Sequence, residues 1–368
     1  RPESGSWASF DIQLAFYGIA LAVIGLLMAW TNSPGGPLAP GSIFTRGLMW
    51  FAIAIVAFIA VAAFDYRWLR TFSWLLYVVS IGLLLLTMVI GVTINGAQRW
   101  VSVGGLTFQF SEISKVIMIA VLAAFLAARH DSLGKLSTLI GVGILIAPPF
   151  VLVMIQPDLG TSLVLIAIAA GALFLSGASL RWMGLAAAGV VAALPIVWSV
   201  LQDYQRRRLL SFLDPTSDPQ GAGFQVMQAQ IAVGSGGIFG KGLTGGAQGA
   251  ASFLPVQSTD FAFAVLLEEL GFVGGMVVFV LFVALIWRVL VIGWRSDSVF
   301  GIAFAGGTAA MIVFQILVNA GMTAGMMPVT GIPLPFITHG GASLISTAIA
   351  LGLMQSIAMR NEKSQPAW

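Results

Sequence analysis

The sequence contains no cysteine and few charged residues, and these two shortages exclude several classes of protein. Without cysteine, disulfide bridges, thiolate metal sites and cysteine nucleophiles are impossible. Only 8% of the 368 residues are charged, whereas soluble domains carry about 25%, and 58% are hydrophobic. The net charge of +3 is too small to predict nucleic-acid binding. This composition is that of an integral membrane protein.

Apolar runs of roughly 17–25 residues, the length that crosses a bilayer as a helix, recur along the chain. We therefore predict an all-α integral membrane protein with about ten transmembrane helices, in one polytopic domain that covers residues 1–368. No small-residue cleavage site follows the first span, so we expect this span to be retained. The predicted spans are residues 12–30, 48–64, 73–91, 113–128, 136–155, 161–177, 183–201, 261–287, 299–318 and 341–359.

The basic residues predict which side of the membrane each joint faces. Ten spans put both termini on one side, and by the positive-inside rule the more basic set of joints is cytoplasmic. The longest loop, about residues 202–260 between spans seven and eight, is then extracytoplasmic, together with the loops at 92–112 and 319–340. The cytoplasmic set comprises Arg67, Arg70, Arg129, Lys135, Arg181, Arg288, Arg295, Arg360 and Lys363.

The extracytoplasmic loop ends at Asp260, where an apolar helix is predicted to begin. An aspartate at this position accepts N–H bonds as a helix cap, which is a structural role. Glu268 and Glu269 follow about two turns deeper, and carboxylates within a span are expected to be functional or paired. Withdrawal from water raises the pKa of a carboxyl group, which suits a general base. Capping and catalysis both remain open for Asp260.

Cations on the same side form a second group of candidates. Glu112 and Lys115 are three residues apart on one helix face, either as an anchoring ion pair or with Lys115 turned toward an anion. The consecutive Arg206, Arg207 and Arg208 either bind lipid phosphates at the interface or recognise a diphosphate.

Lys241 lies in a glycine-rich tract, GSGGIFGKGL. Because Gly242 follows the lysine, the tract is not a Walker A motif, but its glycines can expose N–H groups as an anion-binding nest. Asp158, in QPDLGTS, is predicted to cap the sixth span. His339 has no clustered ligands and is weak evidence for a metal site.

Six segments across nearly the whole chain resemble the SEDS family (shape, elongation, division and sporulation). The GKG at 240–242 and the GIPLPF at 331–336 are more similar to the rod-shape (RodA) branch than to the division (FtsW) branch. The matching segments are NGAQRW (95–100), FSEISK (110–115), QPDLGTS (156–162), QAQIAVGSGGIFGKGL (228–243), LPVQSTDFAFAVLLEELG (254–271) and PVTGIPLPFITHGGASL (328–344).

The resemblance implies a peptidoglycan glycosyltransferase that polymerises lipid II on the outer face of the bacterial cytoplasmic membrane. It makes Asp260 the catalytic aspartate and Glu112 and Lys115 a functional pair, although Phe110 stands where the family motif has proline. It also implies two partners. One is lipid II, an undecaprenyl-pyrophosphate-linked substrate, and the other is a class B penicillin-binding protein, the transpeptidase that crosslinks the glycan.

An inverting displacement fits these residues, with Asp260 as the base and the leaving pyrophosphate stabilised by Lys115, Lys241 and some of residues 206–208. A divalent cation, Mg or Mn, is a candidate cofactor, but the sequence contains no dedicated set of metal ligands. Two other classes of protein remain as alternatives. A lipid II flippase is disfavoured because alternating access requires a site at the midplane. A scaffold for the penicillin-binding protein would leave Asp260 and Lys115 dispensable.

Overall fold

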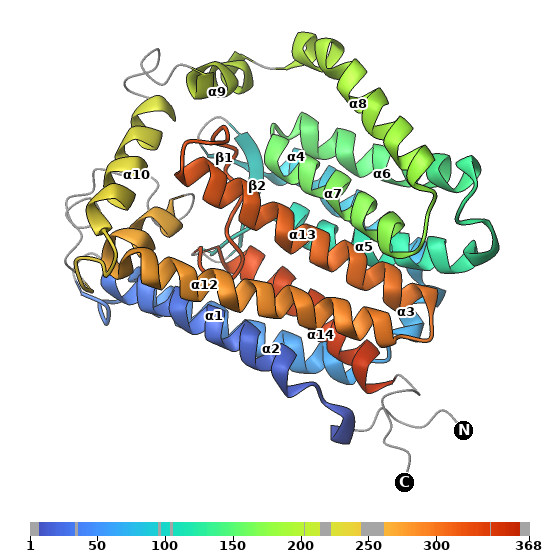
Figure 1. The fold of residues 1–368 in the computed structure, drawn as a ribbon, viewed down its shortest axis with the longest axis horizontal. Helices are drawn as coiled ribbons and strands as arrows, with labels where there is room; N and C mark the ends of the chain where they lie inside the picture. Colours follow the sequence, from blue (N-terminus) through green and yellow to red (C-terminus); the bar gives the residue numbers. More distant parts are fainter. Residues whose placement is uncertain are drawn as a thin grey trace.

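The structure, a computed structural model, describes residues 7–33, 36–94, 97–103, 106–201, 203–213, 222–243, 261–338 and 340–360. Within these ranges a long helix coincides with each of the ten predicted spans (Figure 1). Eight of them are long and apolar enough to cross a membrane, and the other two, α7 and α8, contribute shorter apolar segments. The prediction of an all-α integral membrane protein is confirmed. The ten helices are α1 (Ile12–Thr31), α2 (Ile43–Ala63), α4 (Ser73–Ile90), α5 (Phe110–Ala128), α6 (Leu136–Ile155), α7 (Leu159–Leu175), α8 (Leu180–Val200), α12 (Ala262–Arg295), α13 (Val299–Thr323) and α14 (Gly341–Met359).

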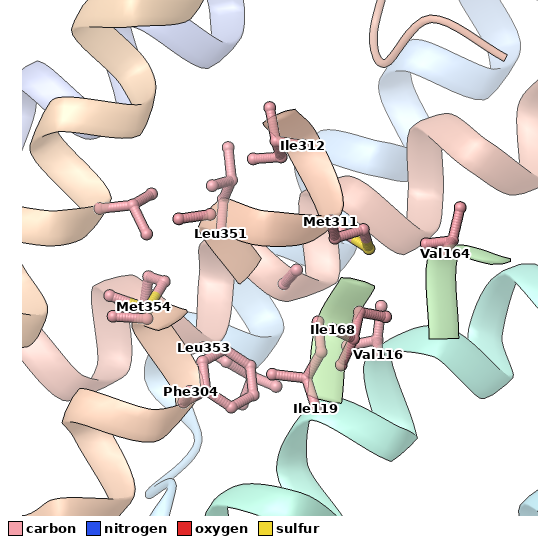
Figure 2. Packing of buried hydrophobic residues seen from close by; sticks show 14 of the residues in the cluster. Val116, Ile119, Val164, Ile168, Phe304, Met311, Ile312, Leu351, Leu353 and Met354 are labelled. Atoms are coloured by element: carbon pink, nitrogen blue, oxygen red, sulfur yellow. The ribbon is translucent and has the colours of Figure 1, made fainter. Parts of the chain in front are cut away.

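Three helices, α5, α13 and α14, form the centre of the bundle. Between 72% and 89% of their membrane-spanning windows is buried inside the protein, against 11% for α2 and 17% for α4. Figure 2 shows the apolar side chains of α5, α7, α13 and α14 meeting in this core, among them Ile119, Ile168 and Phe304. The outer helices instead expose large apolar side chains, as a lipid-facing surface requires.

One end of the bundle, which we call the basic end, carries the described residues that were predicted to be cytoplasmic, and Lys363 lies outside the described residues. The start of α1, the end of α14 and the short elements α3 (Arg67–Thr71) and η2 (His130–Ser132) lie there. Arg288 lies inside α12 and not in a joint, so the predicted end of this span at residue 287 was too early. Its Nη2 atom is 2.6 Å from Oδ2 of Asp11, the N-cap of α1. Because the arginine is paired, the helix can continue past it.

Arg360, which follows α14, closes the C-terminal end of α2. Its guanidinium donates to the carbonyl oxygens of Ala63 at 2.7 Å and Ala62 at 3.2 Å. The Ser356 hydroxyl donates to the carbonyl of Phe64 at 2.6 Å. Carbonyl groups at a helix C-terminus have no N–H partner within the helix. α14 and the residue that follows it therefore complete the hydrogen bonding of α2.

The opposite end, which we call the polar end, contains irregular backbone and a small antiparallel sheet. The strands β1 (Val92–Ile94), β2 (Ala97–Val103) and β3 (Leu106–Phe108) stand where the sequence predicted only a loop. Residues 324–338 follow α13 without forming a helix of their own. Asn319 donates to the Ile332 carbonyl at 2.9 Å, and the Thr338 hydroxyl accepts from the Leu334 N–H at 2.8 Å. Such bonds are what irregular backbone needs at membrane depth.

The region predicted as a long extracytoplasmic loop contains two helices that the sequence analysis did not identify. They are α9 (Asp203–Leu213) and α10 (Ala222–Gly236). α10 packs against α12, and its residues Ala229 and Ala232 join Phe261 in a small buried cluster. The small and polar side chains of α10 gave no strong apolar periodicity, which explains why the helix was missed.

α12 is broken at Gly271, whose backbone has φ of 66° and ψ of −167° and is not helical. The break divides α12 into a half-helix, residues 262–270, and a long helix, residues 272–295. At such a break the last carbonyls of the first piece and the first N–H groups of the second lose their helical partners. Inside a membrane protein these groups need other partners.

The segment of residues 237–242, which we call the bracing segment, supplies the partners on both sides of the break. Two of its N–H groups donate to the half-helix, and two of its carbonyls accept from the long helix. The exchange resembles a short strand pairing with the broken helix. The four bonds, each 3.0 Å long, join Lys241 N to Glu268 O, Gly242 N to Glu269 O, Phe272 N to Gly237 O and Val273 N to Ile238 O.

Glycine is required where the bracing segment meets the break. Gly240 has φ of +78°, a left-handed conformation that other residues adopt only with strain. A Cβ atom at this position would also collide with the carbonyl oxygen of Glu269. The close approach of the two backbones therefore depends on the absence of a side chain.

We predict that Gly240→Ala lowers the stability of the folded protein by about 1–3 kcal/mol, because the variant forces both a strained φ and a steric collision. Thermal unfolding of the detergent-solubilised protein measures this effect. Gly143→Ala, at a helical position of α6 with open space around it, is the control and should change stability by less than about 0.5 kcal/mol. Equal melting temperatures for the two variants would contradict the bracing role.

Candidate functional site

The Glu112–Lys115 ion pair predicted from the sequence is present in the first turns of α5. The Lys115 ammonium lies 2.7 Å from Oε1 of Glu112, and both side chains are almost completely buried, with 1% and 3% exposed. The Ser346 hydroxyl of α14 donates to the second carboxylate oxygen of Glu112 at 3.2 Å. The pair therefore joins α5 to α14, and in this structure it holds the ammonium inside the protein.

Asp158 caps α7, as its sequence context predicted. Its carboxylate accepts from the backbone N–H of Thr161 at 3.1 Å and from the hydroxyl of the same residue at 2.9 Å. It also accepts from the side chain of Gln109 at 2.7 Å and lies 3.4 Å from the guanidinium of Arg99 on β2. Asp158 thus links α7, the start of α5 and the small sheet.

Lys241 contacts a carboxylate in the half-helix. Its ammonium lies 2.9 Å from Oε1 of Glu268, whose side chain is completely buried, while 32% of the Lys241 side chain is exposed. The Ser235 hydroxyl donates to the same carboxylate oxygen at 3.4 Å. Glu268 thus compensates the positive charge of Lys241, and the predicted cation of the glycine-rich tract has a partner within the protein.

The glycine-rich tract does not form the anion-binding nest that its sequence suggested. The N–H of Gly240 donates to the Gly236 carbonyl at 2.8 Å, and those of Lys241 and Gly242 donate to the half-helix. The last two groups therefore bond across the break in α12, and that of Gly240 closes the end of α10. Sequence analysis could not show the bonds of Lys241 and Gly242, because their acceptors, Glu268 and Glu269, are 27 positions away in the chain.

The three consecutive arginines lie on α9. The Arg206 guanidinium donates to the carbonyls of Trp198 at 3.2 Å and Ser199 at 2.8 Å, so this arginine caps the C-terminal end of α8. For Arg207 and Arg208 the structure describes the helical backbone alone. The sequence analysis offered two roles for these arginines, binding of lipid phosphates and recognition of a diphosphate. Neither hypothesis predicted that Arg206 would cap a helix.

Asp260 and His339 lie outside the described residues. The N-cap of α12 is Phe261, which makes no side-chain capping bond. Asp260 therefore precedes the N-cap by one residue. The predicted carboxylates two turns further, Glu268 and Glu269, are both buried.

Among the described residues, no three histidine, aspartate or glutamate side chains come together as a metal site. At the polar end, Glu112, Asp158 and Glu268 each lie beside a cation of the protein itself. These residues do not by themselves fit a divalent cation, so we derive no chemical step through a metal.

Comparison with known proteins places this fold and these motifs in one family. The profile of the family described as Cell cycle protein, which covers FtsW, RodA and SpoVE, matches residues 12–363. The chain belongs to this family. It is the SEDS family that the sequence motifs resemble, and the match covers every helix of the bundle.

Individual SEDS proteins are similar over nearly their whole length. The peptidoglycan glycosyltransferase MrdB of Escherichia coli (strain K12) is 39% identical over 340 residues, which cover 92% of this chain and 90% of MrdB. One chain of a structure described as "Structural coordination of polymerization and crosslinking by a peptidoglycan synthase complex" aligns with a TM-score of 0.80 and 33% identity. The alignment covers 96% of this chain and 98% of that one. The rod shape determining protein RodA of Thermus thermophilus aligns with a TM-score of 0.71 and 26% identity, over 97% and 99% of the two chains.

We predict that Lys115→Met and Glu112→Gln each lower the stability of this SEDS protein by about 3–5 kcal/mol, because either change leaves the other group buried without its charged partner. Combining the two substitutions should recover most of the loss. Thermal unfolding in detergent measures the effect, with Asp131→Asn as the control, since the Asp131 side chain is 91% exposed. Single variants that are as stable as the control would show that the pair does not anchor α5.

Proposed function

We propose that this chain is a peptidoglycan glycosyltransferase that polymerises lipid II into glycan strands at the outer face of the bacterial cytoplasmic membrane. The observation that carries the proposal is the 39% identity to a peptidoglycan glycosyltransferase, MrdB, over 92% of the chain. The relatedness to RodA, a rod shape determining protein, supports a role in cell elongation. The enzyme is an inverting glycosyltransferase in this proposal.

Asp260 is the proposed general base. In the chain it precedes Phe261, the N-cap of α12, by one residue. Asp260 takes the proton from the 4-hydroxyl of the acceptor sugar, and the freed oxygen attacks the anomeric carbon of the growing chain. The bond from that carbon to the pyrophosphate breaks, and undecaprenyl pyrophosphate leaves with its electron pair. Attack from the face opposite the leaving group inverts the anomeric centre.

The leaving pyrophosphate requires positive charge. Lys115, Arg207 and Arg208 are the proposed donors of this charge, because guanidinium and ammonium groups bind phosphate oxygens well. Lys115, Arg206 and Lys241 have the contacts to Glu112, α8 and Glu268 described above, and these contacts compete with a substrate role. In this proposal the Lys115 ammonium therefore leaves Glu112 when it binds the pyrophosphate. A divalent cation, Mg or Mn, stays a separate proposal, and no step above depends on it.

We also propose that a class B penicillin-binding protein is the partner of this chain. The support comes from the structural similarity to a chain of a peptidoglycan synthase complex that coordinates polymerization and crosslinking. A polymerase that feeds nascent glycan to a transpeptidase would benefit from a stable complex with it.

We predict that Asp260→Asn and Asp260→Ala make no glycan polymer from purified lipid II, while the wild-type protein does, because the variants lack the base. Polymer length and amount are measured with and without the class B penicillin-binding protein. Unfolding temperatures confirm that the variants are folded, and Asp131→Asn, at the basic end, is the matched control with normal activity.

Two results would contradict this assignment. Unchanged polymerisation by the Asp260 variants would remove Asp260 as the base and direct attention to Glu112 or Glu268. If the wild-type protein makes no polymer but moves lipid II across the bilayer of vesicles, the chain is a flippase and not a polymerase.

The proposed orientation puts the polar end outside and both termini in the cytoplasm, in accordance with the positive-inside rule. We predict that a membrane-impermeant maleimide labels Met326→Cys, but not Asp131→Cys, in intact spheroplasts. Both positions are strongly exposed, and the natural chain has no cysteine that would give a background signal. Labelling of both variants after the membrane is opened is the control. The reverse pattern in intact spheroplasts would invert the proposed topology.

A further inference from the structure

Lys241 and Glu268 are joined twice. Their side chains form an ion pair of 2.9 Å, and the N–H of Lys241 donates to the carbonyl of Glu268 at 3.0 Å. The bracing segment is therefore fixed to the end of the half-helix by both backbone and charge. Of the four backbone bonds across the break, this one is reinforced by an ion pair between the same two residues.

The half-helix, residues 262–270, is enclosed by the protein on two sides. Phe263 and Leu266 pack into the main core, whereas Ala264 and Val265 pack into the small cluster with α10. These contacts are apolar. Directional bonds hold the C-terminal end of the half-helix, where the bracing segment and Glu268 meet, and they resist a shift of the half-helix along its own axis.

The Lys241–Glu268 pair differs from a surface ion pair, which contributes little to stability. Glu268 is completely buried, so loss of the lysine would leave a carboxylate in a medium that solvates it poorly. The half-helix would have to shift or open to hydrate this group. Because the half-helix is short and internally hydrogen-bonded, a shift at its C-terminal end also shifts its N-terminal end. Asp260 directly precedes that end in the chain.

We propose that Lys241 is a positioning residue, and not a ligand of the substrate diphosphate. Through Glu268 it holds the half-helix in the register that places the preceding Asp260 for proton transfer. This inference rests on the proposed function, in which Asp260 is the base. Its physical reason is that displacement of a reacting group by about 1 Å can cost about a hundredfold in rate.

The two possible roles of Lys241 make opposite predictions for Glu268. If Lys241 positions the half-helix, Glu268→Gln has the same effect as Lys241→Met, because either change removes the charge pair. If Lys241 binds the diphosphate, Glu268→Gln releases the ammonium from its carboxylate partner and binding of the substrate is retained or improved. Glu268→Gln is therefore the decisive variant.

The first measurement is hydrogen exchange of the backbone amides of residues 262–270, which requires no enzymatic activity. We expect exchange to be faster by about tenfold or more in Lys241→Met and Glu268→Gln, and to be close to wild type in Lys241→Arg. Arg288→Met is the matched control, since it breaks a similar pair with a buried carboxylate, Asp11, at the other end of α12. Unchanged exchange in the two neutral variants would overturn the proposal.

The second measurement separates turnover from binding with purified lipid II. We expect kcat to fall by about tenfold or more in each neutral variant, lipid II affinity to change by less than about twofold, and the double variant to be no slower than either single one. Lys241→Arg should retain most of the activity. Multiplying effects in the double variant, or weaker lipid II binding in Lys241→Met alone, would make Lys241 a substrate ligand.

The two measurements also separate this proposal from the proposed function. If the wild-type protein makes no polymer, the glycosyltransferase assignment fails, while the exchange of residues 262–270 still decides whether the pair holds the half-helix. If the wild type is active and exchange is unchanged, the positioning role alone fails.

Discussion

The hydrogen bonding of backbone groups at the break in α12 is the constraint on which the polar end of this protein depends. An unpaired N–H or C=O within a membrane costs several kcal/mol, so a helix cannot simply stop and restart there. The bracing segment resolves this at Gly271 by exchanging four bonds with the two pieces of α12. The irregular residues 324–338 obey the same requirement, with Asn319 and Thr338 supplying side-chain partners.

Buried carboxylates at the polar end follow a second, electrostatic pattern. Glu112, Asp158 and Glu268 each lie beside a cation. The pairs of Asp158 and Glu268 connect separate elements, and Glu112 connects α5 to α14 through Ser346. Burial of an ion pair costs desolvation free energy, and removal of one partner costs still more because the other charge stays buried. Such pairs therefore fix the relative positions of side chains more than they raise the net stability of the fold. This pattern suits an enzyme whose chemistry requires polar groups at the edge of an apolar bundle.

The parts of this structure that the sequence predicted are those set by local pattern. The ten spans follow from long apolar runs, the Glu112–Lys115 pair from spacing on one helix face, and the Asp158 cap from its place before α7. The extension of α12 past Arg288 was missed because its partner, Asp11, lies 277 positions away in the chain. The Lys241–Glu268 pair was missed for the same reason, since 27 residues separate its members. Spacing rules apply within one helix and cannot reveal contacts that only tertiary packing creates.

The closure of α2 by Arg360 and Ser356 has a consequence for how the chain assembles. Ala63 and Arg360 are 297 positions apart, so the carbonyls at the end of α2 have no hydrogen-bond partner from this region until α14 and Arg360 have been synthesised. Until then, α2 lies in the membrane without these hydrogen bonds at its C-terminal end and without α14, its main packing partner. We therefore expect a nascent chain that does not yet contain α14 to be inserted but incompletely packed, with α2 open to quality-control proteases. The folding of α2 is in this sense completed only after translation has passed Arg360.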